Sequence, residues 1–348
     1  MPNNGVTKVL VVDDSAYVRK VVTQMLSRSP SLEVVGIARD GREALDQVAE
    51  LHPDVVTCDL IMPNLDGVGF VTEQMARKPL PIVIVSVASE AGELALNALD
   101  AGAVDFIQKP TALASERLLE ISEELIEKVK AAATARLRQS PAAYPAARMP
   151  LTVPMVSRGT FDVIVLGIST GGPQALRSLL PQLPAALPVP MAIVLHMPVG
   201  FTELYARKLD ELSPLRVCEA SDGMEMEPGV VLLAPAGRHL SLRRTDRGTV
   251  VAHLDLRPLD TPHRPSVDVL FQSAADAYRG RVLGIVMTGM GEDGREGAAW
   301  IKARGGTIVT ESEDSCVVYG MPRAIVEAGL SDRVVGLDRM AEAILENV

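Results

Sequence analysis

The chain has 348 residues, of which 47% are hydrophobic, 3% aromatic and 22% charged, and its formal net charge at pH 7 is −10. This length excludes a single small domain, because a typical domain has about 150 residues, and it predicts two hydrophobic cores. The acidic balance and the few aromatic rings argue against nucleic-acid binding, which needs cationic side chains for phosphates and rings for stacking on bases.

The cysteines and the first residues of the sequence indicate the cellular compartment in which we expect the protein. Cys58, Cys218 and Cys316 are scattered and form no CxxC pair for a metal or redox site. We therefore expect a reduced, cytoplasmic protein. The opening segment MPNNGVTKVLVVDDS has a polar start and only a short apolar run, so we expect neither a signal peptide nor membrane insertion.

Residues 7–138 alternate short apolar runs with amphipathic stretches. The runs are KVLVV, LEVVGIA, DVVTCDL, PIVIVSV and VDFI, and a helical pattern follows each of them. Five strand and helix pairs in strict alternation predict an α/β domain with a parallel sheet covered on both faces. In such sheets ligands bind at the carboxyl ends of the strands.

A linker and a second α/β domain are predicted next. Residues 139–157, QSPAAYPAARMPLTVPMVS, are rich in Pro and Ala, have no apolar period, and indicate a semi-stiff linker. Strand-like runs resume at DVIVLG, MAIVLH, VVLLAPA, RVLGIVM and GGTIVT, and HLSLRRTDRGTVVAHL is typical of a hairpin. The predicted domains are residues 1–138 and 158–348, and the second is expected to be doubly wound with mostly parallel strands.

Polar residues follow the predicted strands of the first domain. Asp13 and Asp14 follow KVLVV, Asp59 follows DVVTC, and Lys109 follows VDFIQ, so a parallel sheet would bring them together. Clustered carboxylates repel one another unless a cation neutralises them, and an all-oxygen site suits Mg²⁺. Lys109 could then bind a phosphoryl group, Ser86 could supply a hydroxyl, and Asp59 could act as a carboxylate nucleophile.

Each of these residues alone has a simpler interpretation, since an Asp pair after a strand usually caps a helix. Together, however, VVDDS, CDLIMPNLDG, VSV and FIQKP resemble the response-regulator receiver domain over residues 6–130. The resemblance implies a (βα)5 flavodoxin-like fold with Asp59 as the phosphoacceptor. It also implies Mg²⁺ binding by Asp13, Asp14, Asp59 and the Ile61 carbonyl, and phosphate sensing by Ser86, Lys109 and the aromatic switch Phe106.

The second domain begins with a serine placed like a nucleophile. The apolar run FDVIVLG leads into Ser169 within GISTG, and Pro173 suits the first turn of the helix that follows. Glycines allow a sharp turn, and amides at a helix start favour negative charge. This arrangement suits either the oxyanion of an acyl transfer or a bound phosphate.

A serine nucleophile needs a base and a third group that holds the base. His196 ends the run VPMAIVLH, on the same predicted sheet edge as Ser169, although a strand-end histidine is more often structural. Asp293 in MTGMGEDGREG is the candidate to orient it, with Glu292 as a rival, and either acid could simply face a helix start. The order serine, histidine, aspartate differs from the serine, acid, histidine of α/β-hydrolases. The other histidines are placed at a helix end (His52), in the hairpin (His239 and His253) and in a loop (His263).

The segments GISTGGPQAL, VLHMPVGFTELYARKLD, PHRPSVDVLFQSAA, MTGMGEDGREG and CVVYGMPRAI resemble the catalytic domain of the CheB family of chemotaxis protein-glutamate methylesterases, over residues 160–346. The resemblance implies Ser169 as nucleophile, His196 as general base, Asp293 as the group that orients it, the Met290 amide as an oxyanion donor, and Thr170 as a lining residue.

The same resemblance implies the reaction and its partners. The expected reaction is hydrolysis of glutamate γ-methyl esters on methyl-accepting chemotaxis receptors, with release of methanol, together with glutamine deamidation. The esterase reaction would need no cofactor. A chemotaxis histidine kinase would supply the phosphoryl group, and the unphosphorylated receiver would cover the esterase site.

Two other classes of function are weighed against this one. A glycine-rich turn that cradles a dinucleotide would give a phosphorylation-controlled oxidoreductase, but the spacing is GxxxGG rather than GxGxxG and the next strand ends in His196 rather than an acid. A DNA-binding output domain would be shorter, more basic and less rich in strands.

Overall fold

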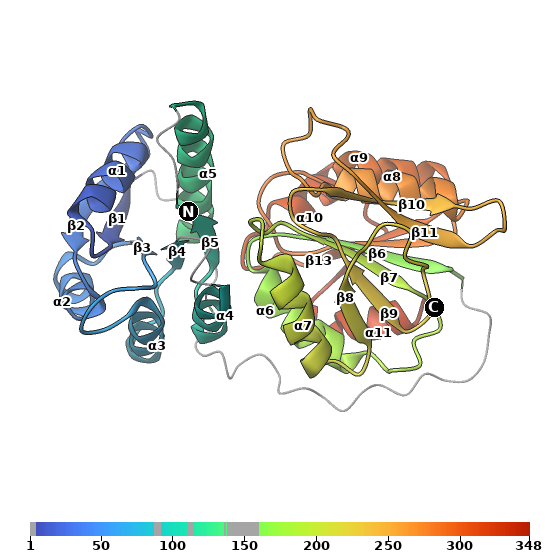
Figure 1. The fold of residues 1–348 in the computed structure, drawn as a ribbon, viewed down its shortest axis with the longest axis horizontal. Coiled ribbons are helices and arrows are strands. Elements are labelled where there is room, and N and C mark those ends of the chain that lie inside the picture. Colours follow the sequence, from blue (N-terminus) through green and yellow to red (C-terminus); the bar gives the residue numbers. More distant parts are fainter. Residues whose placement is uncertain (1–4, 87–91, 110–114, 136, 138–159) are drawn as a thin grey trace. The chain divides into compact units, whose positions relative to one another are not determined.

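The computed structural model describes residues 5–86, 92–109, 115–135, 137 and 160–348 (Figure 1). The chain divides into two compact units, Met1–Tyr144 and Pro145–Val348. The predicted linker, residues 139–157, lies outside the described residues, as do the predicted domain ends at 138 and 158. None of the described helices is long and apolar enough to cross a bilayer.

Strands and helices alternate along the first unit, as predicted. They are β1 (Thr7–Val12), α1 (Ala16–Leu26), β2 (Leu32–Ala38), α2 (Gly41–Leu51), β3 (Val55–Cys58), α3 (Gly67–Arg77), β4 (Ile82–Ser86), α4 (Gly92–Ala101), β5 (Asp105–Gln108) and α5 (Ser115–Ala133). The strands form one parallel sheet in the order β2-β1-β3-β4-β5. Helices α1 and α5 cover one face and α2, α3 and α4 the other (Figure 1).

Short polar side chains begin three of these helices. The Ser15 hydroxyl accepts a hydrogen bond from an amide of α1, and Asp40 and Asp66 do the same for α2 and α3. Such N-caps satisfy amides that have no partner within the helix. Because Ser15 caps α1, the carboxylates of Asp13 and Asp14 are not the caps of that helix. The sequence pattern therefore places them between strand and helix, where they can serve a site.

The second unit is doubly wound. Its elements are β6 (Val163–Ile168), α6 (Gly172–Leu179), a 3₁₀ turn (Leu180–Gln182), β7 (Met191–Leu195), α7 (Thr202–Leu212), β8 (Arg216–Glu219), β9 (Val230–Leu233), β10 (His239–Arg244), β11 (Val250–Asp255), α8 (Val267–Ala277), β12 (Val282–Val286), α9 (Arg295–Ala303), β13 (Thr307–Glu311), α10 (Met321–Glu327), β14 (Arg333–Val335) and α11 (Leu337–Leu345). One parallel sheet has the order β14-β13-β12-β6-β7-β9-β8, and β10 and β11 form the predicted antiparallel hairpin. Helices α8, α9 and α10 lie on one face and α6, α7 and α11 on the other (Figure 1).

Four elements of this unit were not predicted from the sequence. Strands β8 and β14 are the two edges of the sheet, and only one residue of each is buried. An edge strand with so few buried positions leaves no clear apolar period. Helices α10 and α11 are also short, with seven and nine residues.

The order of the strands reverses at β6. This strand pairs with β7 on one side and with β12 on the other. The chain leaves β6 towards β7 and returns later to β12, so the direction of winding reverses at β6. Ligands of doubly wound sheets bind at such a switch point. Ser169 follows β6 directly, which places it at this position.

A buried hydrogen bond ties α7 to the helix that follows Ser169. The Tyr205 hydroxyl donates to the Pro173 carbonyl at 2.6 Å, and Tyr205 is almost fully buried. Burial raises the pKa of Tyr205 well above its usual range, so the phenol stays protonated and remains a donor. This bond fixes the first turn of α6.

Replacing Tyr205 with Phe should lower the free energy of unfolding of the second unit by about 1 kcal/mol, because a buried hydrogen bond is lost. Equilibrium urea unfolding, followed by the fluorescence of Trp300 in α9, measures this value. Tyr278→Phe is the matched control, since Tyr278 is also buried but its hydroxyl makes no hydrogen bond to the described residues. Equal losses in the two variants would contradict the role given to the Tyr205 bond.

Candidate functional site

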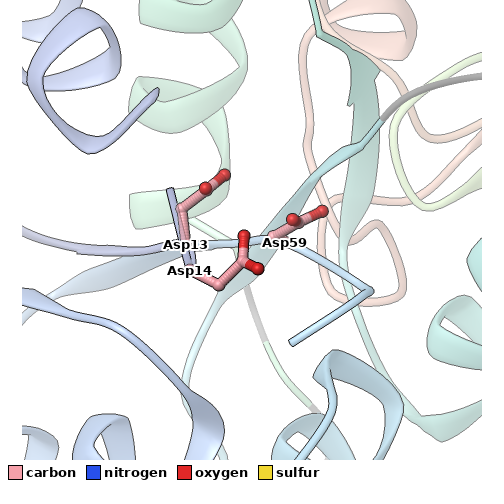
Figure 2. Close-up of side chains that lie close together, drawn as sticks. All are labelled: Asp13, Asp14 and Asp59. Atoms are coloured by element: carbon pink, nitrogen blue, oxygen red, sulfur yellow. The ribbon is translucent and has the colours of Figure 1, made fainter. Parts of the chain in front are cut away.

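Three carboxylates meet at the carboxyl edge of the first sheet (Figure 2). Asp13 and Asp14 follow β1 and Asp59 follows β3, and these two strands are hydrogen-bonded neighbours. One oxygen from each carboxylate lies within 4.8 Å of the others. Asp13 and Asp59 are buried, whereas Asp14 is exposed. The structure thus brings together the three acids that the sequence singles out.

Lys109 neutralises part of this charge. Its Nζ lies 2.6 Å from Asp13 Oδ2 and 2.7 Å from Asp59 Oδ2. Burial opposes the charge on Lys109, but hydrogen bonds and attraction to both carboxylates outweigh it, so the pKa of Lys109 is raised. Burial also raises the pKa of Asp13, although its contact with Lys109 acts in the opposite direction. The predicted lysine and acids therefore form one buried charge cluster.

The other receiver residues singled out by sequence lie on the neighbouring strands. Ser86 ends β4 and is buried, and its carbonyl accepts a hydrogen bond from the Lys109 amide at 2.8 Å. Phe106 is buried within β5. The Ile61 side chain is 49% exposed. The sheet therefore places Ser86 beside Lys109, while the Phe106 ring lies inside the unit.

One buried cation near Phe106 was missed by sequence reasoning. Lys128 of α5 donates hydrogen bonds to Asp105 Oδ1 at 3.1 Å and to the Phe106 carbonyl at 2.8 Å, and its Nζ lies 6.0 Å from the Phe106 ring centroid. Burial acts to lower the pKa of Lys128, but attraction to Asp105 and Glu124 outweighs it and the pKa is raised. The only sequence signal for this contact was that Lys128 falls on the apolar face of the helical pattern of α5.

The acidic cluster fits a hard divalent cation. Asp13, Asp14 and Asp59 offer only oxygen ligands, and Mg²⁺ binds such sets through one or two carboxylates together with water and phosphate oxygens. The exposed side of Asp14 leaves a path to solvent. Residues present at this edge of the sheet are therefore suited to Mg²⁺.

Parallel pairing places the three candidate catalytic residues of the second unit on adjacent strands. Ile168 of β6 pairs with Leu195 of β7, so Ser169 and His196 are the next residues on the two strands. The His196 amide donates to the Ile168 carbonyl at 3.2 Å. On the other side, the Ser169 amide donates to the Thr288 carbonyl at 3.0 Å, just after β12.

The turn after Ser169 depends on Gly171. This residue precedes α6 with φ +79°, a left-handed conformation that favours glycine, and a Cβ there would lie 2.6 Å from the Cβ of Val317. Pro173 occupies the first turn of α6, as predicted. Thr170 is buried, and its carbonyl accepts a hydrogen bond from the Thr288 hydroxyl at 3.0 Å. The turn is therefore fixed on both sides.

His196 and Asp293 form a direct pair. His196 Nε2 lies 2.9 Å from Asp293 Oδ2, and the side chains are 11% and 8% exposed. Asp293 Oδ2 also accepts from the Val267 amide at 2.8 Å, while Oδ1 accepts from the Ser266 hydroxyl at 2.9 Å and the Asp268 amide at 3.1 Å. Glu292, the rival acid, instead pairs with Arg295. The structure brings Asp293, and not Glu292, to His196.

The surroundings of Asp293 indicate which ring nitrogen of His196 carries the proton and which can accept one. Burial opposes the charge on Asp293, but the hydrogen bonds from His196 and from the two amides outweigh it and hold its pKa well below the usual range. An ionised carboxylate only accepts hydrogen bonds, so His196 Nε2 carries the proton. In a neutral imidazole Nδ1 is then the basic atom. It is buried and makes no hydrogen bond to the described residues.

Two other predicted groups make no hydrogen bond to the residues that the structure describes. In the described part of the chain, neither the Ser169 hydroxyl nor the Met290 amide makes a hydrogen bond. The histidine and aspartate are thus linked, whereas no hydrogen bond joins Ser169 to His196. Catalytic hydrogen bonds are often long before substrate binds.

Sequence reasoning missed two supports of this site. The ring of His263 stacks on that of His196, with centroids 4.2 Å apart and planes at 26°, although the loop in which it lies gave no signal for this contact. Glu311 ends β13 fully buried and accepts hydrogen bonds from the Thr288 amide and the Ser315 hydroxyl, both at 2.9 Å. A lone acid at the end of an apolar run was the only signal for Glu311.

Comparison with known proteins shows which families the two units resemble. A family model described as CheB methylesterase matches residues 164–344, and one described as response regulator receiver domain matches residues 9–122. The chain is 51% identical to protein-glutamate methylesterase/protein-glutamine glutaminase 5 of Myxococcus xanthus, over 98% of each chain, and 46% identical to the protein-glutamate methylesterase/protein-glutamine glutaminase of Halalkalibacterium halodurans, over 97% of each.

A solved structure shows the same likeness for the second unit. The crystal structure of the Thermotoga maritima CheB methylesterase catalytic domain is 40% identical, with a TM-score of 0.53, and the match covers 56% of this chain and all of that one. The family-model match extends over more than half of the chain, and the relatives match almost all of it. The chain therefore belongs to the CheB methylesterase family and carries a response-regulator receiver domain before its catalytic domain.

Proposed function

We propose that this chain is a phosphorylation-activated enzyme that hydrolyses glutamate γ-methyl esters on methyl-accepting chemotaxis receptors and releases methanol. The observation that carries the proposal is the buried His196–Asp293 pair beside Ser169 at the switch point of the sheet. Its relatives' names, protein-glutamate methylesterase/protein-glutamine glutaminase, supply the substrate class. The three free cysteines support a reduced, cytoplasmic setting.

In the acylation step the Ser169 hydroxyl attacks the ester carbonyl carbon. His196 Nδ1 takes the serine proton, and Asp293 stabilises the resulting imidazolium through Nε2–H. The Met290 amide donates a hydrogen bond to the tetrahedral oxyanion, a contact worth about 3 to 4 kcal/mol where such donors have been removed. The bond to the methoxy oxygen then breaks, and His196 returns the proton to methanol.

In the deacylation step water replaces methanol. His196 Nδ1 takes a proton from water as the water oxygen attacks the glutamyl carbonyl carbon. The bond to Ser169 Oγ then breaks and His196 returns the proton to this oxygen, which leaves the glutamate carboxylic acid and the free Ser169 hydroxyl. A glutamine side chain would pass through the same acyl intermediate with ammonia as the leaving group. Apart from substrate and water, the two steps use only Ser169, His196, Asp293 and the Met290 amide.

An oxidoreductase is the less favoured alternative. A dinucleotide would need a glycine fingerprint after β6 and an acid near the end of the next strand for the ribose. Here β7 is followed by His196 rather than an acid, and His196 is paired with Asp293. This pairing favours acyl transfer.

The receiver residues are proposed to take and hold a phosphoryl group. A chemotaxis histidine kinase is the proposed donor, and the phosphorus–nitrogen bond breaks as an Asp59 oxygen bonds to phosphorus. Lys109 leaves Asp59 and pairs with a phosphoryl oxygen, while Ser86 donates its hydroxyl. Mg²⁺ held by Asp13, Asp14, Asp59 and the Ile61 carbonyl would supply positive charge against the phosphoryl oxygens. Phe106 is the proposed aromatic switch.

Phosphorylation is proposed to remove a block on the esterase site. A receiver that covers the site in 99% of molecules needs about 5.5 kcal/mol to be open in 99% of them, and a smaller activation needs less. The replacement of the Lys109–Asp59 contact by an acyl phosphate is the local change that would drive this shift.

Ser169→Ala should reduce methanol release from methylated receptor membranes by about 10³-fold or more, because the covalent step loses its nucleophile. Gas chromatography of methanol measures the rate, in the presence of a small-molecule phosphodonor. Ser241→Ala, in the hairpin, is the control and should keep the parent rate. Release by Ser169→Ala at the parent rate would exclude Ser169 as the nucleophile.

Asp59→Asn should keep the basal rate of methanol release and lose the increase that a phosphodonor causes in the parent, because the amide cannot form an acyl phosphate. A fragment that begins at Arg158 should be active without the donor. If this fragment is slower than the intact unphosphorylated protein, inhibition by the receiver is wrong.

Lys109→Met should lower the stability of the first unit at pH 7 by about 3 kcal/mol, since it leaves two buried carboxylates without their cation. Hydrogen exchange of the β1 and β3 amides measures this loss, and millimolar Mg²⁺ should recover more of it than it adds to the parent. Lys130→Met, which removes an exposed pair with Glu127, is the control. An equal response of both variants to Mg²⁺ would contradict binding at the acidic cluster.

A further inference from the structure

Helices α8 and α9 cap each other. Asp293, just before α9, caps the start of α8, and Asp268 of α8 caps the start of α9. The residue before α8, Ser266, makes no cap to its own helix, and the amides of Val267 and Asp268 instead donate to the Asp293 carboxylate. Asp293 belongs to the turn before α9. In return, Asp268 Oδ1 accepts a hydrogen bond from the Gly297 amide in the first turn of α9, at 2.7 Å.

No other side chain in the described part of the chain caps either helix. The residue before α9 is Gly294, which has no side chain to offer. The two helices approach closely at this point, because a Cβ on Gly297 would lie 2.5 Å from the Phe271 Cβ and 3.0 Å from the Asp268 Cα. Among the described side chains, Asp268 is therefore the one that accepts a hydrogen bond from an amide in the first turn of α9, close to the turn that carries Asp293.

The carboxyl groups of Asp268 and Asp293 also meet. Burial raises the pKa of Asp268 to about 7, and the charge of Asp293, a hydrogen bond to its carboxylate and the charge of Glu296 act in the same direction, against the Gly297 amide. Asp293 stays ionised. The other ionisable groups nearby are His196, beyond Asp293, and the buried His239, whose Nδ1 accepts from the Ser266 amide.

We propose that Asp268 is a positioning residue for the esterase reaction, which holds the Asp293 carboxylate against His196 by capping α9 with one oxygen and donating a hydrogen bond to Asp293 with the other. The inference rests on the function proposed above. Asp268 does not reach the substrate and acts only through Asp293.

The consequence is a pH dependence of the reaction that is set by Asp268. Below about pH 7 Asp268 is neutral and donates to Asp293. Above it, Asp268 loses this proton and two neighbouring carboxylates repel each other, so Asp293 is held less firmly and kcat falls. Asn at this position keeps an acceptor for Gly297 and a permanent donor for Asp293, and so imitates the neutral acid at every pH.

The test uses the full chain with a phosphodonor and methylated receptor membranes, and compares Asp268→Asn, Asp268→Ala and Asp276→Asn. Asp276 lies on the same helix and pairs with Arg304 at the surface, which makes it the matched control. Asp268→Asn should match the parent kcat below pH 7 and exceed it several-fold above, with a midpoint near 7. Asp268→Ala should lose about tenfold in kcat with little change in KM, and Asp276→Asn should follow the parent at every pH.

The inference would be overturned if the ratio of the parent kcat to the Asp268→Asn kcat stayed constant with pH. It would also be overturned if the Asp268→Ala variant had the same kcat as the Asp276→Asn variant. A measurement without substrate separates this failure from failure of the proposed function. Carboxyl ¹³C NMR of aspartate-labelled protein should show one aspartate that titrates near pH 7 in the parent and in Asp276→Asn but not in Asp268→Asn. Absence of such a resonance in the parent overturns the inference whether or not methanol is released.

Discussion

The arrangement of the candidate catalytic residues depends on the hydrogen bonds of the Asp293 carboxylate. This carboxylate accepts hydrogen bonds from two amides at the start of α8, from the Ser266 hydroxyl and from His196. Amides at a helix start carry partial positive charge, so they stabilise the ionised acid even though it is buried. The ionised acid in turn places the His196 proton on Nε2 and leaves Nδ1 as the base. Helix capping, burial and the identity of the basic nitrogen are thus consequences of one interaction.

The receiver domain stabilises its buried carboxylates in a different way. Its carboxylates also lie at the carboxyl ends of parallel strands, but a lysine side chain faces the buried pair, Asp13 and Asp59. A lysine can move away from its partners, whereas amides at a helix start cannot. A buried charge that must change partners during a phosphorylation cycle is suited to the first arrangement. An acid that must hold its partner in a fixed position, the role proposed for Asp293, is suited to the second.

The sequence predicts which residues form the two sites because the carboxyl ends of parallel strands lie at the same edge of a sheet. Ser169, His196 and Asp293 each follow an apolar run, and adjacency of β6, β7 and β12 brings the three segments together. The capping exchange between Asp268 and Asp293 could not be predicted, because it depends on how closely α8 and α9 pack and not on any period in one helix. The stack of His263 on His196 depends on an irregular loop for the same reason. The edge strands β8 and β14 were missed because they bury too little to produce a pattern. The proposed roles of the site residues stay predictions, as does the linker at 139–157.

The local geometry also limits where control of the reaction can act. The His196–Asp293 pair belongs to a buried network that includes the starts of two helices, and its loss would cost several hydrogen bonds at once. A reversible signal of a few kcal/mol is poorly matched to such a rearrangement. The Ser169 hydroxyl and the Met290 amide, by contrast, have no hydrogen bond to lose within the described residues. Substrate can therefore complete the site without disturbing the network, and regulation by phosphorylation needs only to govern whether substrate reaches Ser169.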